Sequence, residues 1–82
     1  MELKDTVELM QSSDYKERFK AEYQQTKIRY EGLRKMLIKW DAGKLEFTPT
    51  CQKSLYMEQK RYMGEYLRIL ETRAVIDGID LD

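Results

Sequence analysis

Apolar and aromatic side chains recur at alternating spacings of four and three residues through the first half of the chain. The series comprises Phe19, Tyr23, Thr26, Tyr30, Leu33, Leu37 and Trp40, and only Thr26 interrupts it. This spacing places every member on one face of a helix and is typical of a seam packed against another helix. Asp14, with Glu17 three residues later, predicts a reciprocal cap at the start, and Gly43 predicts a left-handed stop. We therefore expect a long helix over residues 14–42.

A second long helix is expected after the dipeptide Thr48–Pro49. Proline forces the residue before it out of the helical region, so Thr48 is expected to cap a helix over residues 49–76, with Pro49 at its first position. The apolar stripe of this segment is wide: Leu55, Tyr56, Gln59, Tyr62, Met63, Tyr66, Leu67, Leu70 and Ala74. In addition, Leu55, Tyr62, Ile69 and Ile76 repeat every seven residues. So wide a stripe predicts that this helix has two packing neighbours.

Two long helices joined by a short turn over residues 43–48 predict an antiparallel hairpin. The expected fold class is all-α, in a single domain of residues 1–82 with a short helical arm over 1–13 and an acidic tail over 77–82. In such a hairpin the numbers of facing residues sum to about 92, which places Phe19 near Arg73 and Lys20 beside Thr72 and Arg73. The arm is expected to fold either against its own hairpin or against a neighbouring subunit.

A single hairpin seam buries little apolar surface for a chain of 82 residues. A domain this small seldom gains more than about 3–5 kcal/mol from its own core. Further apolar residues lie outside the seam, at Ile28, Met36, Ile38 and Met57. We therefore expect the hairpins to assemble into a symmetric helical homo-oligomer.

The residue types that most enzymes use are scarce in this chain. It contains no histidine, so Ser-His-Asp and Cys-His arrangements and an imidazole general base are excluded. The lone Cys51 is better interpreted as a small apolar residue in a first helical turn than as a reactive thiolate. With one cysteine and no histidine, the chain offers no metal site of the cysteine and histidine type. The four glycines do not cluster into a phosphate loop. We expect a protein that binds rather than an enzyme, with no catalytic residue, metal or cofactor.

Charge is unevenly distributed along the chain although its formal net charge is zero. Residues 15–40 carry a net charge of +5 and residues 52–73 carry +2, whereas residues 1–14 and 74–82 carry −3 each. A basic middle between acidic ends suits a small phosphorylated ligand and disfavours long nucleic acid. It is equally compatible with solvated helix faces that bear pairs such as Glu31 and Lys35. No apolar run approaches the roughly 18 residues of a membrane span, and no signal-peptide pattern is present, so we expect a cytoplasmic protein without a membrane partner.

Tyrosines are interleaved with the basic middle, at Tyr15, Tyr23, Tyr30, Tyr56, Tyr62 and Tyr66. Their rings could stack on nucleotide bases beside phosphate-binding Lys and Arg, or could form a polar oligomer interface, which composition alone favours. Gly32 and Gly64 lie within the expected helices, where glycine costs roughly 0.5–1 kcal/mol relative to alanine. Each glycine has three interpretations: it allows two helices to approach closely, it leaves room for a ligand, or it is a tolerated surface position.

Four stretches spread over nearly the whole chain carry a family resemblance: RFKAEY at 18–23, FTPTC at 47–51, MGEYL at 63–67 and RA at 73–74. They resemble a family of small proteins encoded by gut phages of the crAss-like kind and by prophages. The layout of two helices with a leading arm is similar in turn to the phage anti-CBASS and anti-Thoeris sponges. Those proteins form symmetric oligomers that sequester cyclic nucleotide immune signals without cleaving them.

This second resemblance implies a set of ligand-binding residues. Lys20-Ala21-Glu22 and Thr72-Arg73-Ala74 resemble stretches that lie in the ligand pockets of the sponges. They imply phosphate binding by Lys20 and Arg73, and stacking by Tyr23 or Tyr15. The implied ligand-binding set is Lys20, Arg73, Tyr23, Thr72, Tyr15 and Arg18.

Two functions from different classes remain open. The first is a phage-type anti-defence protein that sequesters a cyclic di- or trinucleotide in the cytoplasm of an infected bacterial host. The alternative is a helical protein–protein interaction module that blocks a host defence protein. Calorimetry with cyclic nucleotides discriminates between them.

Overall fold

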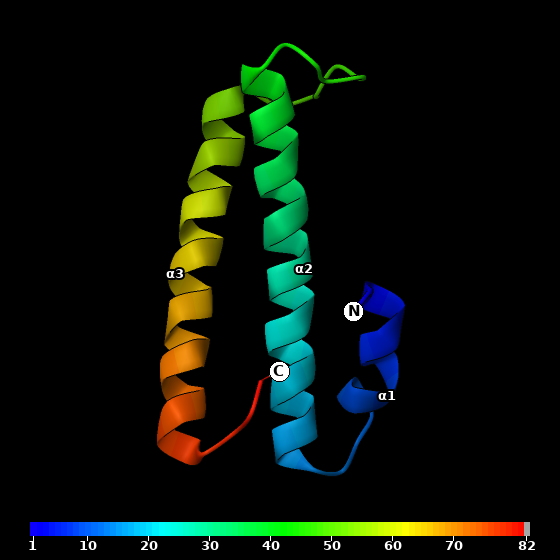
Figure 1. Cartoon of the computed structure of the whole chain (residues 1–82), viewed down its shortest axis with the longest axis vertical. Coiled ribbons are helices and arrows are strands. Elements are labelled where there is room, and N and C mark those ends of the chain that lie inside the picture. The colour runs from blue at the N-terminus through cyan, green and yellow to red at the C-terminus, as the bar shows by residue number, and fades with distance from the viewer. Residues whose placement is uncertain (82) are drawn as a thin grey trace.

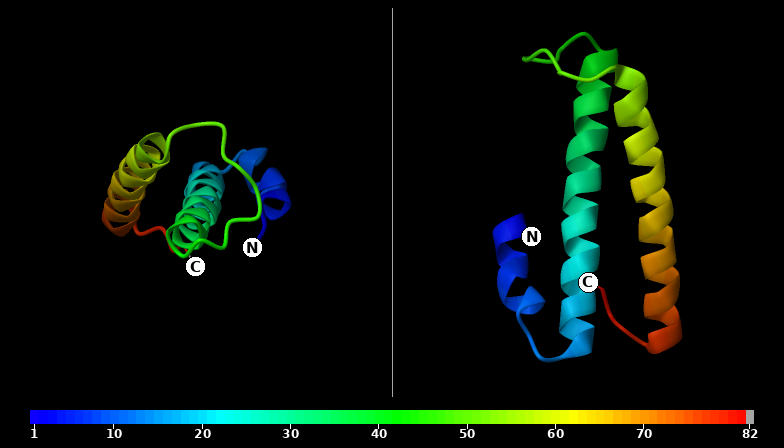
Figure 2. Two further views of the ribbon diagram at one scale, coloured as in Figure 1. Left: turned by 90° about the horizontal axis from the view of Figure 1, so that it is seen from above. Right: turned by 180° about the vertical axis from the view of Figure 1, so that it is seen from behind.

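The computed structural model describes residues 1–81 and contains helices and loops but no strand within that range. Two long antiparallel helices, α2 (Tyr15–Asp41) and α3 (Lys53–Asp77), lie side by side (Figure 1). A short arm of one 3-10 turn, η1 (Leu3–Thr6), and one helical turn, α1 (Val7–Met10), lies on the opposite side of α2 (Figure 2). The predicted all-α hairpin with a leading arm is therefore confirmed for one chain. None of the helices described is long and apolar enough to cross a membrane.

The start of α2 is capped by Asp14, although not in the predicted reciprocal manner. One carboxylate oxygen of Asp14 accepts a hydrogen bond from the backbone N–H of Lys16 at 2.9 Å. Glu17 does not reach back to Asp14, because the hydroxyl of Ser12 donates to its carboxylate at 3.1 Å and accepts from the Asp14 N–H at 3.0 Å. Asp14 therefore keeps its role as cap, and Ser12 replaces Glu17 as the acceptor for the Asp14 N–H.

The end of α2 follows the prediction made from Gly43. This glycine has a φ of +71°, in the left-handed region. Its N–H donates to the carbonyl of Trp40 at 3.0 Å, and the N–H of Lys44 donates to the carbonyl of Lys39 at 2.8 Å. This pair of bonds satisfies two carbonyls that the helix end would otherwise leave unpaired.

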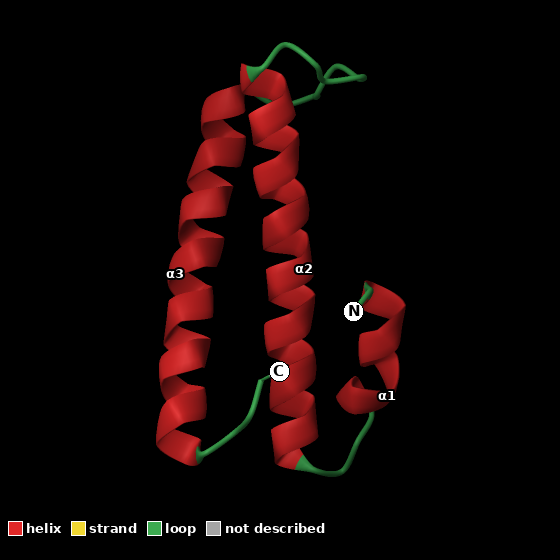
Figure 3. Cartoon of the chain, in the orientation of Figure 1, coloured by secondary structure: helices red, strands yellow, loops and turns green. Residues whose placement is uncertain are grey.

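The predicted start of the second helix at Pro49 is wrong, because α3 begins at Lys53 with Gln52 as its cap residue. Lys53 forms an ion pair with Asp41, the last residue of α2, and its ammonium group lies 5.9 Å from the Trp40 ring. Residues 49–52 therefore lie beyond the end of α2, where a further helical turn would have no helix to pack against. The connection between the helices is correspondingly longer than the predicted 43–48 turn (Figure 3).

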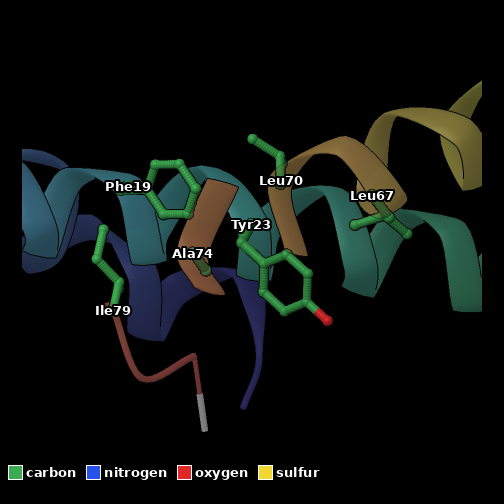
Figure 4. Close-up of a cluster of buried hydrophobic side chains, with 6 residues drawn as sticks. All are labelled: Phe19, Tyr23, Leu67, Leu70, Ala74 and Ile79. Atoms are coloured by element: carbon green, nitrogen blue, oxygen red, sulfur yellow. The ribbon is translucent and has the colours of Figure 1, made fainter. Parts of the chain in front are cut away.

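The hydrophobic core occupies the half of the hairpin remote from the connecting loop. Its buried residues are Phe19, Tyr23, Leu67, Leu70, Ala74 and Ile79 (Figure 4). Leu70 is completely buried. Facing pairs such as Phe19 with Arg73 and Tyr15 with Asp77 confirm the predicted register.

Gly64 permits one close approach within this seam. A Cβ atom at this position would lie 3.3 Å from Cε1 of Tyr30, a contact tight enough that the ring would have to move. By contrast, a Cβ atom at Gly32 would meet nothing within 4 Å. The two helical glycines therefore serve different purposes: Gly64 admits a ring and Gly32 faces open space.

The arm packs against α2 of its own chain. Thr6 is completely buried; its hydroxyl donates to the Leu3 carbonyl at 2.7 Å and accepts from the amide of Gln25 at 3.0 Å. A guanidinium nitrogen of Arg18 donates to the carbonyl of Ser12 at 2.9 Å, which holds the link between arm and helix. Of the two arrangements expected for the arm, the structure shows the one within its own chain.

The C-terminal segment also folds onto α2. Gly78, with a φ of +66°, ends α3, and the Ile79 N–H donates to the Ala74 carbonyl at 2.8 Å. The side-chain amide of Gln24 then donates to the Leu81 carbonyl at 2.8 Å. The expected acidic tail over 77–82 is therefore a packed segment as far as Leu81, while Asp82 lies outside the described residues.

Candidate functional site

The predicted residues Tyr15 and Arg73 meet at one edge of the hairpin. The Arg73 guanidinium lies 5.0 Å from the Phe19 ring centroid and donates to the Tyr15 hydroxyl oxygen at 3.5 Å. The Tyr15 hydroxyl in turn donates to the carboxylate of Asp77 at 3.0 Å. We call Tyr15, Phe19, Arg73 and Asp77 the arginine cluster. Its cation already has a carboxylate close by, which weakens its attraction for a further anion.

Lys20 does not join this cluster within one chain. It follows Phe19 by one residue and is therefore rotated by about 100° around the helix axis. Its face of α2 is shared with Gln24, which holds the C-terminal segment through the Leu81 carbonyl. No hydrogen bond or ion pair joins Lys20 to Arg73 or Thr72 among residues 1–81, so their predicted meeting stays a prediction. The facing register sets the level of a residue along the hairpin but not the side to which it points.

Tyr23 is a core residue rather than an exposed stacking platform. It is 6% exposed, and its hydroxyl donates to the carboxylate of Glu71 at 3.3 Å. The ammonium group of Lys27 lies 5.7 Å from its ring centroid. Burial raises the pKa of the Tyr23 hydroxyl above its usual value; the charge of Lys27 opposes this shift and Glu71 adds to it.

Because the pKa of Tyr23 is raised in the folded chain, folding should weaken in alkaline solution. Below the unfolded pKa of 10.0 the phenol is neutral in both states and the stability is fully present. Above it the unfolded chain loses this proton first, so the free energy of unfolding falls as the pH rises through the folded pKa. Urea unfolding between pH 8 and pH 11 should therefore show a smaller alkaline loss for Tyr23→Phe than for the native chain. Equal losses would contradict this role of Tyr23.

The two remaining predicted residues make local contacts. The Thr72 hydroxyl donates to the carbonyl of Arg68 on its own helix at 2.9 Å, and its side chain is exposed. Arg18 holds the arm through the Ser12 carbonyl, as described above. Neither residue is hydrogen-bonded to Lys20 or Arg73.

A groove that was not predicted runs along the outer face of α2. It consists of two adjoining hollows of about 440 Å³ and 260 Å³, which share Gly32 and Lys35. The arm bounds the lower hollow through Met1, and the loop after α2 bounds the upper hollow through Phe47. Figures 1 and 2 show that the arm and this loop lie on the same side of α2, away from α3. We call this feature the lysine groove.

Helical spacing distributes three lysines along the lysine groove. Lys27 lines the lower hollow, Lys39 the upper one and Lys35 both. Their spacing in multiples of four keeps them along one side of the helix. Gly32 lies among them and leaves the floor of the groove without a side chain, whereas the ring of Phe47 is 58% exposed at its upper end.

These three lysines have no ion-pair partner among residues 1–81. Glu31, which also lines the groove, pairs with Arg34 at 3.5 Å and not with Lys35 as the sequence suggested. Ammonium groups carry three donors and no acceptor, so they suit an anion. Lys35 and Lys39 therefore bring positive charge without an ion-pair partner to an open groove with an exposed ring. The ammonium group of Lys27 lies over the Tyr23 ring instead, and Glu31 and Glu46 add carboxylates to the lining.

Residues 13–76 of this chain match the family model described as Sequestin. The chain belongs to the Sequestin family. The Sequestin match spans α2, the connecting loop and nearly all of α3, and therefore includes Lys27, Lys35, Lys39 and Phe47 as well as Arg73. The arm and the segment after Ile76 lie outside it. No curated protein and no solved structure matches the chain.

Sequence signals for the lysine groove existed but were not sufficient. Gly32 inside a helix and the lysines at 27, 35 and 39 were visible, yet such a pattern equally describes a solvated face. What turns this face into a groove is the path of the arm and of the loop that carries Phe47. That path depends on tertiary packing, which the spacing of residues does not encode.

Proposed function

We propose that this Sequestin protein binds and sequesters a cyclic di- or trinucleotide in the lysine groove without cleaving it. The observation that carries the proposal is the pair Lys35 and Lys39, which have no ion-pair partner among residues 1–81 and line one hollow beside an exposed phenylalanine ring. The family name supports sequestration as the kind of activity. As an anti-defence protein, the chain would remove a signal nucleotide from the cytoplasm of an infected bacterium.

The chemistry of the lysine groove matches the chemistry of such a ligand. Each phosphodiester carries one negative charge, and each lysine offers a charge-assisted hydrogen bond to it. Stacking of one base on an aromatic ring contributes about 1–3 kcal/mol, and Phe47 is placed to supply that contact at the upper end. The missing side chain at Gly32 leaves room for a ring close to the helix backbone. Holding the ligand requires no group that takes up or releases a proton.

Titration calorimetry with a panel of cyclic di- and trinucleotides tests the proposal. We expect heat of binding from at least one member, with a linear dinucleotide of the same bases binding more weakly because it loses more conformational freedom. Absence of heat from every member would contradict the proposal and favour the alternative, a module that blocks a host protein.

A further inference from the structure

A further hollow of about 340 Å³ lies between the end of α2 and the loop that follows it. No residue of α3 contributes to its lining, and its tryptophan and its proline do not line the lysine groove. The lining residues are Trp40, Gly43, Leu45, Phe47, Thr48 and Pro49. We call this feature the aromatic hollow. Its volume is at the lower end of the range of small-molecule pockets, which starts at roughly 300 Å³.

The indole of Trp40 is held in place from the side of α3. The Tyr56 ring meets it edge to face with the ring centroids 6.1 Å apart, and the Lys53 ammonium group lies 5.9 Å from the centroid of the indole. Lys53 is in turn paired with Asp41. Because α3 supplies these contacts but none of the lining, Trp40 presents to the aromatic hollow an oriented ring that is only half-buried. A ring held before binding loses little conformational freedom when a ligand stacks on it.

The loop beside this ring has hydrogen-bonding groups that the chain does not use. Among residues 1–81, no hydrogen bond involves the backbone N–H groups of residues 45–48 or the hydroxyl of Thr48. A backbone N–H donates and a hydroxyl both donates and accepts, so these groups suit the polar edge of a planar ring. Phe47 adds a second aromatic surface to the lining. The aromatic hollow thus combines flat apolar faces with available donors and an acceptor.

The aromatic hollow adjoins the lysine groove. Leu45 and Phe47 line both features, and Lys39, which precedes Trp40, lines the upper hollow of the groove. Consecutive residues of a helix differ by about 1.5 Å along its axis, so Lys39 and Trp40 stand at nearly the same level of α2. A nucleotide with a phosphate at Lys39 is therefore within reach of the aromatic hollow.

We propose that the aromatic hollow binds one nucleobase of the ligand, stacked on Trp40, while a phosphate of the same ligand lies in the lysine groove. The inference rests on the proposed function for the phosphate site and adds the place at which a base is held. Every nucleobase has a π-face, so an aromatic ring accepts any of them. The ring distinguishes a nucleotide from other phosphorylated compounds, which the lysines alone do not.

The fluorescence of Trp40, the only tryptophan of the chain, tests this directly. The native chain is titrated with adenosine monophosphate and, in parallel, with ribose phosphate, which carries the same phosphate but no base. We expect adenosine monophosphate to quench the fluorescence in a saturable manner and ribose phosphate to leave it unchanged. No saturable quenching by adenosine monophosphate, or an equal change with both compounds, would overturn the proposal.

Two variants with matched exposure show whether the aromatic hollow or any surface ring holds the base. Phe47→Ala removes a ring of the lining, whereas Tyr62→Ala removes a ring outside it; both rings are 58% exposed, and the Arg61 guanidinium lies 4.5 Å from the Tyr62 ring centroid. We expect Phe47→Ala to raise the dissociation constant for adenosine monophosphate about tenfold and Tyr62→Ala to leave it unchanged. Circular dichroism checks that both variants keep native helicity. Equal effects of the two variants would contradict the proposal.

The outcomes separate this proposal from the proposed function. Heat from a cyclic nucleotide without quenching of Trp40 would support sequestration in the lysine groove and overturn the base site. Quenching by adenosine monophosphate without heat from any cyclic nucleotide would support the base site and contradict the sequestration of a cyclic signal.

Discussion

Replacing Lys35 and Lys39 together with alanine is expected to weaken binding of the cyclic nucleotide by about a hundredfold. Both residues line the upper hollow, and neither pairs with a carboxylate among the described residues. A hydrogen bond to a charged group contributes about 1.5–3 kcal/mol, so each lysine accounts for at least about tenfold in affinity. Calorimetry on the folded double variant measures the change.

The control for this double variant is Lys16→Ala together with Lys60→Ala. It removes the same charge from positions that do not line the hollows described here. A second variant, Gly32→Leu, fills the open floor of the lysine groove without changing charge. We expect Gly32→Leu to weaken binding as well, whereas the control pair keeps near-native affinity. If the control pair loses as much affinity as the groove pair, general charge attraction and not the groove holds the ligand.

Arg73→Ala separates the two candidate sites. If it abolishes binding while the groove variants retain it, the ligand lies at the arginine cluster and the residues implied by the family resemblance are correct. If only the groove variants lose binding, Arg73 has a structural role through Phe19 and Tyr15.

Leu70→Ala is expected to destabilise the chain by about 2–5 kcal/mol, enough to unfold most of it at room temperature. Leu70 is completely buried between α2 and α3 and belongs to a small core. Removal of a buried leucine leaves a cavity in addition to the lost transfer free energy. The cost is comparable to the roughly 3–5 kcal/mol that so small a core supplies.

Urea unfolding followed by circular dichroism measures this loss, with Met57→Ala as the control. Met57 is 54% exposed on the same helix, so its truncation should change the free energy of unfolding by less than about 1 kcal/mol. A Leu70→Ala variant as stable as the Met57→Ala variant would show that the hairpin seam does not hold the fold together.

Local sequence rules were sufficient for the first long helix and for the hairpin register. The four-three spacing from Phe19 to Trp40 and the glycine at 43 define α2 almost to the residue. The facing register follows from the position of the turn, and pairs such as Tyr15 with Asp77 confirm it. Both features depend on spacing along one chain, which the sequence states directly.

Spacing along the chain did not predict where α3 starts, nor which residues lie together at the candidate site. Pro49 is compatible with a first helical position, yet helix there would lack a partner because α2 ends at Asp41. Lys20 and Arg73 share a level in the hairpin, but a shared level does not fix the side of a helix on which a residue lies. The lysine groove depends on the positions of Met1 and Phe47, which belong to segments without a periodic pattern.

The central claim is that the protein holds its ligand without cleaving it. The most direct test is to measure how much nucleotide is bound and whether it is released intact. The protein is mixed with a cyclic nucleotide that gives heat in calorimetry, filtered to measure the free ligand, and then heated to release what it holds. Sequestration predicts that free ligand falls with added protein and that mass spectrometry recovers the full amount as the intact cyclic compound. No depletion of the free ligand, or recovery of a linear product, would contradict it.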